Sequence, residues 1–331
     1  MRLGRENQKT TILFIFLSFL ISGFARADSY PVLSLEGKWR FALDPQDAGL
    51  QEQWYLQNLT EEICLPGILQ SQGFGNPISK ETPWVLSLYD RFWYLRREYR
   101  KYEEGDVKVP FLSQPPRHYL GPAWYQRDVE IPKKWKGRRV VLFLERTRWL
   151  STVWIDNRQI GSGDSLVAPH SFDLGILMVG THRLTIRLDN RMLMDYRPDA
   201  HSVSDSLGST WNGIAGRIEM ISTTPVWLDD VQAFPDIQNK SVRLKVQIGN
   251  ITSQAGKGTL TAEKVQVPVS WIAEGGQAEL TVPLGKNAAL WDEFNPVLHR
   301  LTVKLKGKNA DDRKEIRFGL RQISTDGCDL L

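Results

Sequence analysis

Histidine, serine and cysteine are the residue types through which this 331-residue chain could do nucleophilic chemistry, and it has only five histidines and two cysteines. Gly163, Asp164, Ser165 and Leu166 spell the Gly-Asp-Ser-Leu motif of one class of serine esterases. That chemistry needs a histidine base, which the class presents as Asp-x-x-His. None of the histidines here has an aspartate three residues before it, and the motif is predicted to lie in a turn. The sequence therefore argues against a serine esterase.

The sequence also has no motif for a metal site and no local pair of catalytic carboxylates. The sequence has no His-Glu-x-x-His and no pair of cysteines or histidines at ligand spacing, so no metal or other cofactor is predicted. A retaining glycosidase needs two carboxylates about 5 Å apart. The chain has 38 aspartates and glutamates, yet no local arrangement singles out such a pair.

The first 27 residues have the composition of an export signal. An apolar run covers residues 11–21, Ala25 and Ala27 fit a signal-peptidase site, and three basic residues come first: Arg2, Arg5 and Lys9. The run is shorter than the roughly 20 residues that span a membrane. We expect a signal peptide over residues 1–27, cleaved near Ala27, with export to the periplasm or the medium and no membrane anchor.

Charge and cysteine content exclude further classes. The formal net charge of +4 falls to about +1 without the leader, so nucleic acid is not an expected partner. Cys64 and Cys328 lie near opposite ends of the chain, which excludes a small disulfide-stapled scaffold. We expect both to be free thiols.

The elements that must position any site are strands. Apolar and polar residues alternate strictly over residues 33–43, 182–188, 241–249 and 301–305, which is typical of half-buried strands. Residues 140–144 are apolar on both faces, as in a central strand. No stretch after residue 27 keeps a helical stripe over three turns, although residues 47–60 have room for a short helix. The pattern predicts an all-β chain built of sandwiches.

A linker is predicted at Thr223, Thr224 and Pro225, between a first unit and a second of about 95 residues. Several segments on both sides of it carry a family's motifs in order. Gly121, Trp124, Tyr125 and Pro132 have the spacing of one strand motif; the other matching segments are residues 153–161, 169–174, 211–219, 290–298 and 317–321. Together they resemble glycoside hydrolase family 2. At Asn157 and Arg158 the chain departs from the usual Asn-Gly, which changes a turn.

The resemblance implies an all-β fold with a galactose-binding-like jelly-roll domain over residues 28–224 and an immunoglobulin-like sandwich over residues 225–321. Residues 322–331 would lead into a (β/α)8 barrel, which in the family carries both catalytic glutamates. We therefore expect the non-catalytic N-terminal portion of an exported β-glycosidase, inactive alone, whose parent cleaves terminal β-linked sugars with retention. The alternatives are a free-standing secreted carbohydrate-binding protein and an accessory subunit that completes a barrel of another chain.

Sugar-binding residues are expected just before and within the Trp-Asn-Gly-Ile segment, because in the family this region reaches toward the sugar pocket. The resemblance points to His201, Asp205, Trp211 and Asn212. Carboxylate, imidazole and amide groups can hydrogen-bond sugar hydroxyls, and an indole can stack on a sugar ring. A turn role for Asp205, a surface position for His201 and a core position for Trp211 are the competing readings.

Overall fold

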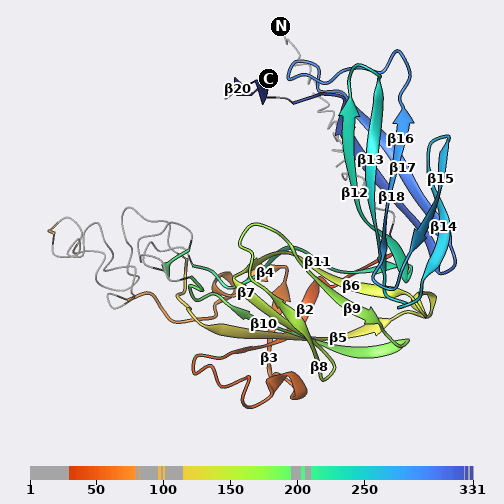
Figure 1. Cartoon of the computed structure of the whole chain (residues 1–331). Coiled ribbons are helices and arrows are strands. Elements are labelled where there is room, and N and C mark those ends of the chain that lie inside the picture. The colour runs from red at the N-terminus through yellow and green to blue at the C-terminus, as the bar shows by residue number, and fades with distance from the viewer. Residues whose placement is uncertain are drawn as a thin grey trace, which may run out of the picture.

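The protein is described by a computed structural model that covers residues 30–79, 82, 96–97, 100, 115–194, 203–205 and 210–323, with the backbone of 325–326 and 329–330. It is a nearly all-β chain of two sandwiches in series, which confirms the predicted fold class (Figure 1). The 3₁₀ turns described over their full length are Trp54–Leu56, Gln70–Gln72 and Lys133–Trp135. None of the described helices is long and apolar enough to cross a membrane.

Two antiparallel sheets form the first sandwich. The five-stranded sheet has the order β1-β11-β6-β9, with β4 beside β11; its strands are β1 (Val32–Ser34), β4 (Gly67–Ile68), β6 (Arg139–Arg148), β9 (His170–Ile176) and β11 (Gly213–Thr223). The six-stranded sheet has the order β3-β2-β5-β10-β7-β8; its strands are β2 (Gly37–Leu43), β3 (Glu61–Leu65), β5 (Pro122–Ile131), β7 (Leu150–Ile155), β8 (Arg158–Gly163) and β10 (Gly180–Asp189).

The core of this sandwich consists of alternate residues of both sheets, including Trp39, Phe41, Tyr125, Leu142 and Ile186, all almost fully buried. Alternation follows from the pleat, which points successive side chains to opposite faces. Burying such large side chains is the main favourable term in the fold, at roughly 25 cal/mol per Å² of apolar surface removed from water.

The second sandwich contains one three-stranded and one four-stranded antiparallel sheet. The orders are β12-β13-β16 and β15-β14-β17-β18; the strands are β12 (Val226–Asp236), β13 (Ser241–Asn250), β14 (Gly256–Ala262), β15 (Val265–Trp271), β16 (Gly276–Pro283), β17 (Leu298–Gly307) and β18 (Ala310–Gly319). It has a core of its own, with Leu244, Leu260, Val303 and Leu305 at the centre. Two short strands, β19 (Thr325–Asp326) and β20 (Asp329–Leu330), pair near the C-terminus.

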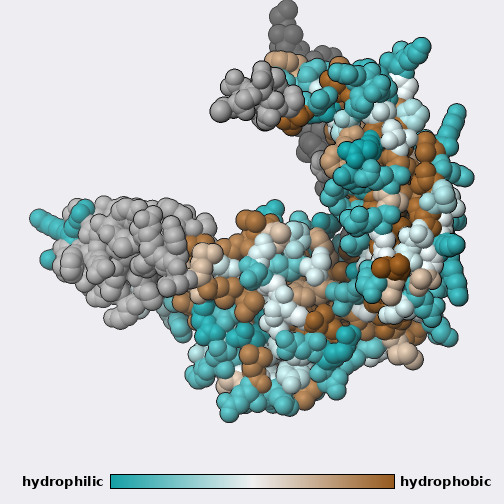
Figure 2. Space-filling view, viewed as in Figure 1, coloured by the Kyte–Doolittle hydropathy of each residue, from teal (hydrophilic) through white to brown (hydrophobic). Residues whose placement is uncertain are grey.

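The second sandwich stands at one end of the first, so that the molecule is L-shaped and hollow on its inner side (Figures 1 and 2). β11 ends at Thr223 and β12 begins at Val226, which leaves a two-residue connection. Residues 140–144 are apolar on both faces because one face packs in the core of the first sandwich and the other borders the second sandwich. Val140 and Leu142 point into the first core, while Val141 and Phe143 line a pocket beside Trp227 of the second sandwich.

Cys64 is exposed and is a free thiol. Cys328 lies outside the described residues, so the prediction of two free thiols stays a prediction. The leader, residues 1–27, also lies outside them.

Candidate functional site

The loop end of the first sandwich brings together residues that are far apart in the sequence. Nε2 of His118 lies 2.8 Å from Oδ2 of Asp205, across 87 residues of chain. Both side chains are mostly buried, with exposed fractions of 13% and 10%. The backbone of His118 is fixed by paired hydrogen bonds to Asn76, N to O at 2.9 and 2.7 Å. The Asp205 carboxylate is thus held through one oxygen by a positioned imidazole.

Arg148, the last residue of β6, shares this end of the sandwich and is only 7% exposed. Its backbone pairs with Gly213, the first residue of β11 and the third of the Trp-Asn-Gly-Ile segment. Burial lowers the pKa of the Arg148 guanidinium, and the negative charge of Asp205 opposes this shift. The two charged groups therefore interact electrostatically, and no sequence pattern had predicted this association.

Of the four sugar-binding residues predicted from the sequence, Asp205 and Trp211 lie at this end. Trp211 is half-buried, and its carbonyl accepts a hydrogen bond from Nδ2 of Asn190 at 3.2 Å. His201 lies outside the described residues. His118, which sequence reasoning did not identify, is the histidine that contacts Asp205.

Asn212 is fully buried, which corrects its expected role as a sugar contact. Its Oδ1 accepts the Tyr125 hydroxyl at 2.8 Å, and its Nδ2 donates to the carbonyls of Gly121 and Leu188. A buried amide with all its groups engaged has nothing left to offer a ligand. Asn212 therefore joins β5, β10 and β11 inside the sandwich.

The Gly-Asp-Ser-Leu segment is structural as well. The Ser165 hydroxyl accepts hydrogen bonds from the amides of Val167 and Ala168, and His170 reaches Ser165 only at its backbone carbonyl. The other imidazole nitrogen of His170 lies 2.6 Å from the Ser151 hydroxyl. Ser151 is completely buried, so this serine and histidine cannot meet a substrate. The geometry agrees with the exclusion of esterase chemistry.

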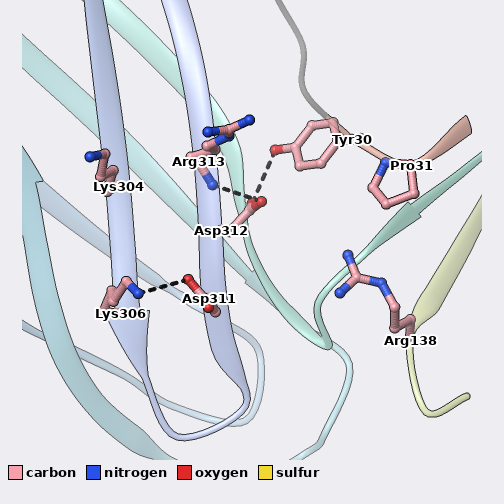
Figure 3. A pocket seen from close by; sticks show the side chains of 8 residues that line it. All are labelled: Tyr30, Pro31, Arg138, Lys304, Lys306, Asp311, Asp312 and Arg313. Carbon is pink, nitrogen blue, oxygen red and sulfur yellow. Dashed lines mark hydrogen bonds and ion pairs between the residues drawn. The ribbon is translucent and has the colours of Figure 1, made fainter. Parts of the chain in front are cut away.

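A second hollow lies where the two sandwiches meet, a pocket of about 350 Å³ with six charged residues in its lining (Figure 3). Its aspartates are already occupied. Asp312 accepts from the Tyr30 hydroxyl and from the amides of Leu228 and Arg313, and Asp311 pairs with Lys306 at 3.3 Å. The pocket borders the start of β6, whereas Arg148 ends that strand, about 30 Å away at roughly 3.3 Å per residue. The hydrogen bonds and ion pair in this pocket therefore belong to the junction between the two sandwiches, which is called the joint below.

Two buried carboxylates elsewhere, those of Asp44 and Asp189, are saturated by protein donors. Asp44 accepts from the amides of Ala48 and Gly49 and from the Trp124 indole at 2.8–3.0 Å. Asp189 is paired with Arg187 and Arg191. A catalytic acid or nucleophile must have an oxygen free to meet substrate. Neither carboxylate satisfies that condition.

Comparisons with known proteins agree with one another. The family model of "Glycosyl hydrolases family 2" matches residues 226–321. A β-glucuronidase of Paenibacillus borealis is 20% identical over 91% of this chain and 47% of its own length. The human β-glucuronidase is 22% identical over 88% of this chain and 44% of its own. The chain thus spans about half the length of the curated relatives it matches.

Solved structures share the fold. A β-galacturonidase of Eisenbergiella tayi matches with a TM-score of 0.60 at 17% identity, over 92% of this chain and 46% of its own. A β-glucuronidase of Ruminococcus gnavus matches with a TM-score of 0.60 at 15% identity, over 92% and 48%. Both matches extend across the two sandwiches.

Proposed function

The chain belongs to glycoside hydrolase family 2, and on that premise we propose that its two sandwiches are the sugar-contacting, non-catalytic part of an exported β-glycosidase of the β-glucuronidase type. The observation that carries the proposal is the Asp205 carboxylate. One oxygen is held by His118, and the other, Oδ1, is buried without a hydrogen-bond partner in the described part of the chain. An oriented carboxylate of this kind suits a sugar hydroxyl.

The saturated state of Asp44, Asp189 and Asp312 supports a non-catalytic role. Glycoside cleavage needs one carboxyl group to protonate the leaving oxygen and a second to attack or to activate water. Groups that only bind substrate, without favouring the transition state, do not accelerate the chemical step. On this proposal Asp205 and Trp211 supply binding and orientation, and the acid and nucleophile come from the half of the relatives' length that this chain does not match.

We assign residues 28–224 to the jelly-roll domain and 225–321 to the immunoglobulin-like domain. In support, the second unit has seven strands divided three and four, as immunoglobulin-type sandwiches do. Its fourth strand, β15, pairs with β14 in the four-stranded sheet.

Export is proposed from the charged, apolar and small-residue parts of residues 1–27. Mass spectrometry of exported material should find Asp28 at the N-terminus; an intact Met1 in the membrane fraction would refute export.

Ligand-observed NMR tests the proposal with methyl β-D-glucuronide as the probe. We expect millimolar binding by the purified chain, because an open site buries little ligand surface. Asp205→Asn should weaken it by about 10-fold, the usual effect of losing a hydrogen bond to a charged group. Asp173→Asn is the matched control, since Asp173 is an exposed residue of β9 that pairs with Arg139.

Equal binding by the two variants would remove Asp205 from the sugar site. The chain could instead bind sugars in an order of affinity that matches the substrate preference of no β-glycosidase. That result would favour a free-standing carbohydrate-binding protein.

A further inference from the structure

Arg148 and Asp205 each bury a polar atom without a protein partner. Nε of Arg148 and Oδ1 of Asp205 make no hydrogen bond, within the described ranges, although each side chain is about nine-tenths buried. Charged groups removed from water normally have every donor and acceptor engaged. Two such atoms of opposite charge at one end of a sandwich point to a ligand that engages both.

The two groups are close, yet they are not a salt bridge. Arg148 pairs through its backbone with Gly213, and Thr210, three residues before Gly213, donates to the carbonyl of Ser204, the neighbour of Asp205. Among the described residues the ion-pair partner of Asp205 is His118 and not Arg148. His118 occupies Oδ2 of Asp205, which leaves Oδ1 facing away from the imidazole. The arrangement therefore offers one fixed donor and one fixed acceptor with a separation larger than a direct ion pair.

A group that bridges them must accept from Nε–H and donate to Oδ1. A hydroxyl does both. A carboxylate cannot donate when ionised and is repelled by Asp205, and an ammonium cannot accept and is repelled by Arg148. A sugar ring carries hydroxyls on adjacent carbons, so one of them can enter while its neighbours stay solvated.

We propose that Arg148 is a sugar-contacting residue that, together with Asp205, binds one hydroxyl of the glycoside rather than a charged substituent. This inference rests on the proposed sugar-contacting function and adds the identity of the recognised group. It predicts that a uronide and the corresponding neutral glycoside bind this end of the sandwich equally well.

The experiment compares methyl β-D-glucuronide, methyl β-D-glucoside and the monodeoxy methyl β-D-glucosides, titrated by ligand-observed NMR. The variants are Arg148→Met, which keeps the aliphatic length, and Arg148→Lys, which keeps the charge and removes Nε–H. Arg217→Lys is the matched control, because Arg217 is an exposed arginine of β11 that pairs with Glu145. Near-ultraviolet circular dichroism and urea midpoints establish that each variant is folded.

We expect the glucuronide and the glucoside to bind wild type within about 3-fold of each other, and both Arg148 variants to bind each about 10-fold more weakly. One deoxy sugar should bind wild type about 10-fold more weakly but bind Arg148→Met as the parent glucoside does. That non-additivity identifies the bridging hydroxyl. Arg217→Lys should match wild type.

Two results would overturn the inference. A glucuronide preference above 10-fold that disappears in Arg148→Lys or Arg148→Met would show that Arg148 binds the carboxylate. Unchanged affinity in folded variants of Arg148 would remove it from the site, while Asp205→Asn still weakened binding. Absence of sugar binding by wild type would instead refute the proposed function itself, and the inference with it.

Discussion

Two histidines of the first sandwich, His170 and His182, have hydrogen-bonded side chains whose pKa values shift in opposite directions. His170 is buried against Ser151, Thr147 and the Ser165 carbonyl, and burial lowers its pKa below the ordinary 6.5. His182 is also partly buried, but its hydrogen bonds to Asp156 and to the Met178 carbonyl outweigh burial and raise its pKa. The two side chains should make opposite contributions to stability in acid.

The first prediction follows from these signs. A histidine with a lowered folded-state pKa stabilises the fold above about pH 6.5, and that contribution is lost as the pH falls. A raised pKa stabilises the fold below about pH 6.5, and that contribution is lost as the pH rises. We therefore expect His170→Asn to lose less stability than wild type between pH 7.5 and 5.5, and His182→Gln to lose more. Urea midpoints followed by tryptophan fluorescence measure both. The same acid loss in both variants would contradict the assignment.

Asn212 shows what one-dimensional reasoning could not supply. A sequence lists an asparagine after a tryptophan but not its partners, Tyr125 and Gly121, which lie 87 and 91 residues away. The same holds for His118, which contacts Asp205 across 87 residues, and for Arg148, which the fold brings to the same end of the sandwich. By contrast, Asp205 was predicted from the family resemblance. Its position before the closing strand could be read directly.

At the scale of elements, period-two alternation predicted strands where β2, β10, β13 and β17 form, because a pleated strand buries every second side chain. The apolar run at residues 140–144 predicted the central strand β6. The segment between β2 and β3 was harder to predict. It makes only one 3₁₀ turn, Trp54–Leu56. The aromatic rings of Trp54 and Tyr55 pack on the outer face of the six-stranded sheet. Tyr55 stacks on Trp154 at 5.3 Å, and Trp154 stacks on Trp124 at 5.3 Å.

Asp47 fastens this covering segment to the end of β10. Its carboxylate oxygens pair with Arg187 at 2.7 Å and Arg191 at 2.6 Å, and Arg187 is buried. Burial works to raise the Asp47 pKa, but the two arginines outweigh it and hold the pKa below the ordinary 3.8. The contact therefore stabilises the protein above about pH 3.8 and is lost as the pH falls below it.

The second prediction is that Asp47→Asn destabilises the chain by about 1–3 kcal/mol, less than the loss of a fully buried pair because Asp47 is partly exposed. Amide exchange should quicken at residues 48–57. Glu62→Gln removes an exposed pair with Lys38 and should change stability by less than about 0.5 kcal/mol. Equal effects of the two changes would show that Asp47 does not hold the segment.

At the scale of the whole molecule, the joint between the sandwiches combines a ring contact with buried polar contacts. The Arg139 guanidinium lies 3.7 Å from the centre of the Trp227 ring while its Nε contacts Asp173 at 2.7 Å. The Tyr30 hydroxyl donates to Asp312 across the same junction at 3.0 Å. These contacts hold the L shape in Figure 1.

The third prediction concerns that shape. Arg139→Gln removes a cation–π contact worth about 1 kcal/mol. We expect a larger radius of gyration by small-angle X-ray scattering and faster proteolysis between Thr223 and Val226. Arg243→Gln is the control, because Arg243 lies over Phe234 within the second sandwich. A joint that stays unchanged in Arg139→Gln would assign its rigidity to other contacts.

Hydrolysis of aryl β-glycosides by the purified chain tests the central claim most directly. The claim is that these sandwiches contact sugar through Asp205 but provide neither the acid nor the nucleophile. We predict no release of nitrophenol from 4-nitrophenyl β-D-glucuronide, β-D-galactoside or β-D-glucoside above the rate with heat-denatured protein. Turnover that co-purifies with the chain and disappears when one of its own carboxylates is replaced would contradict the account.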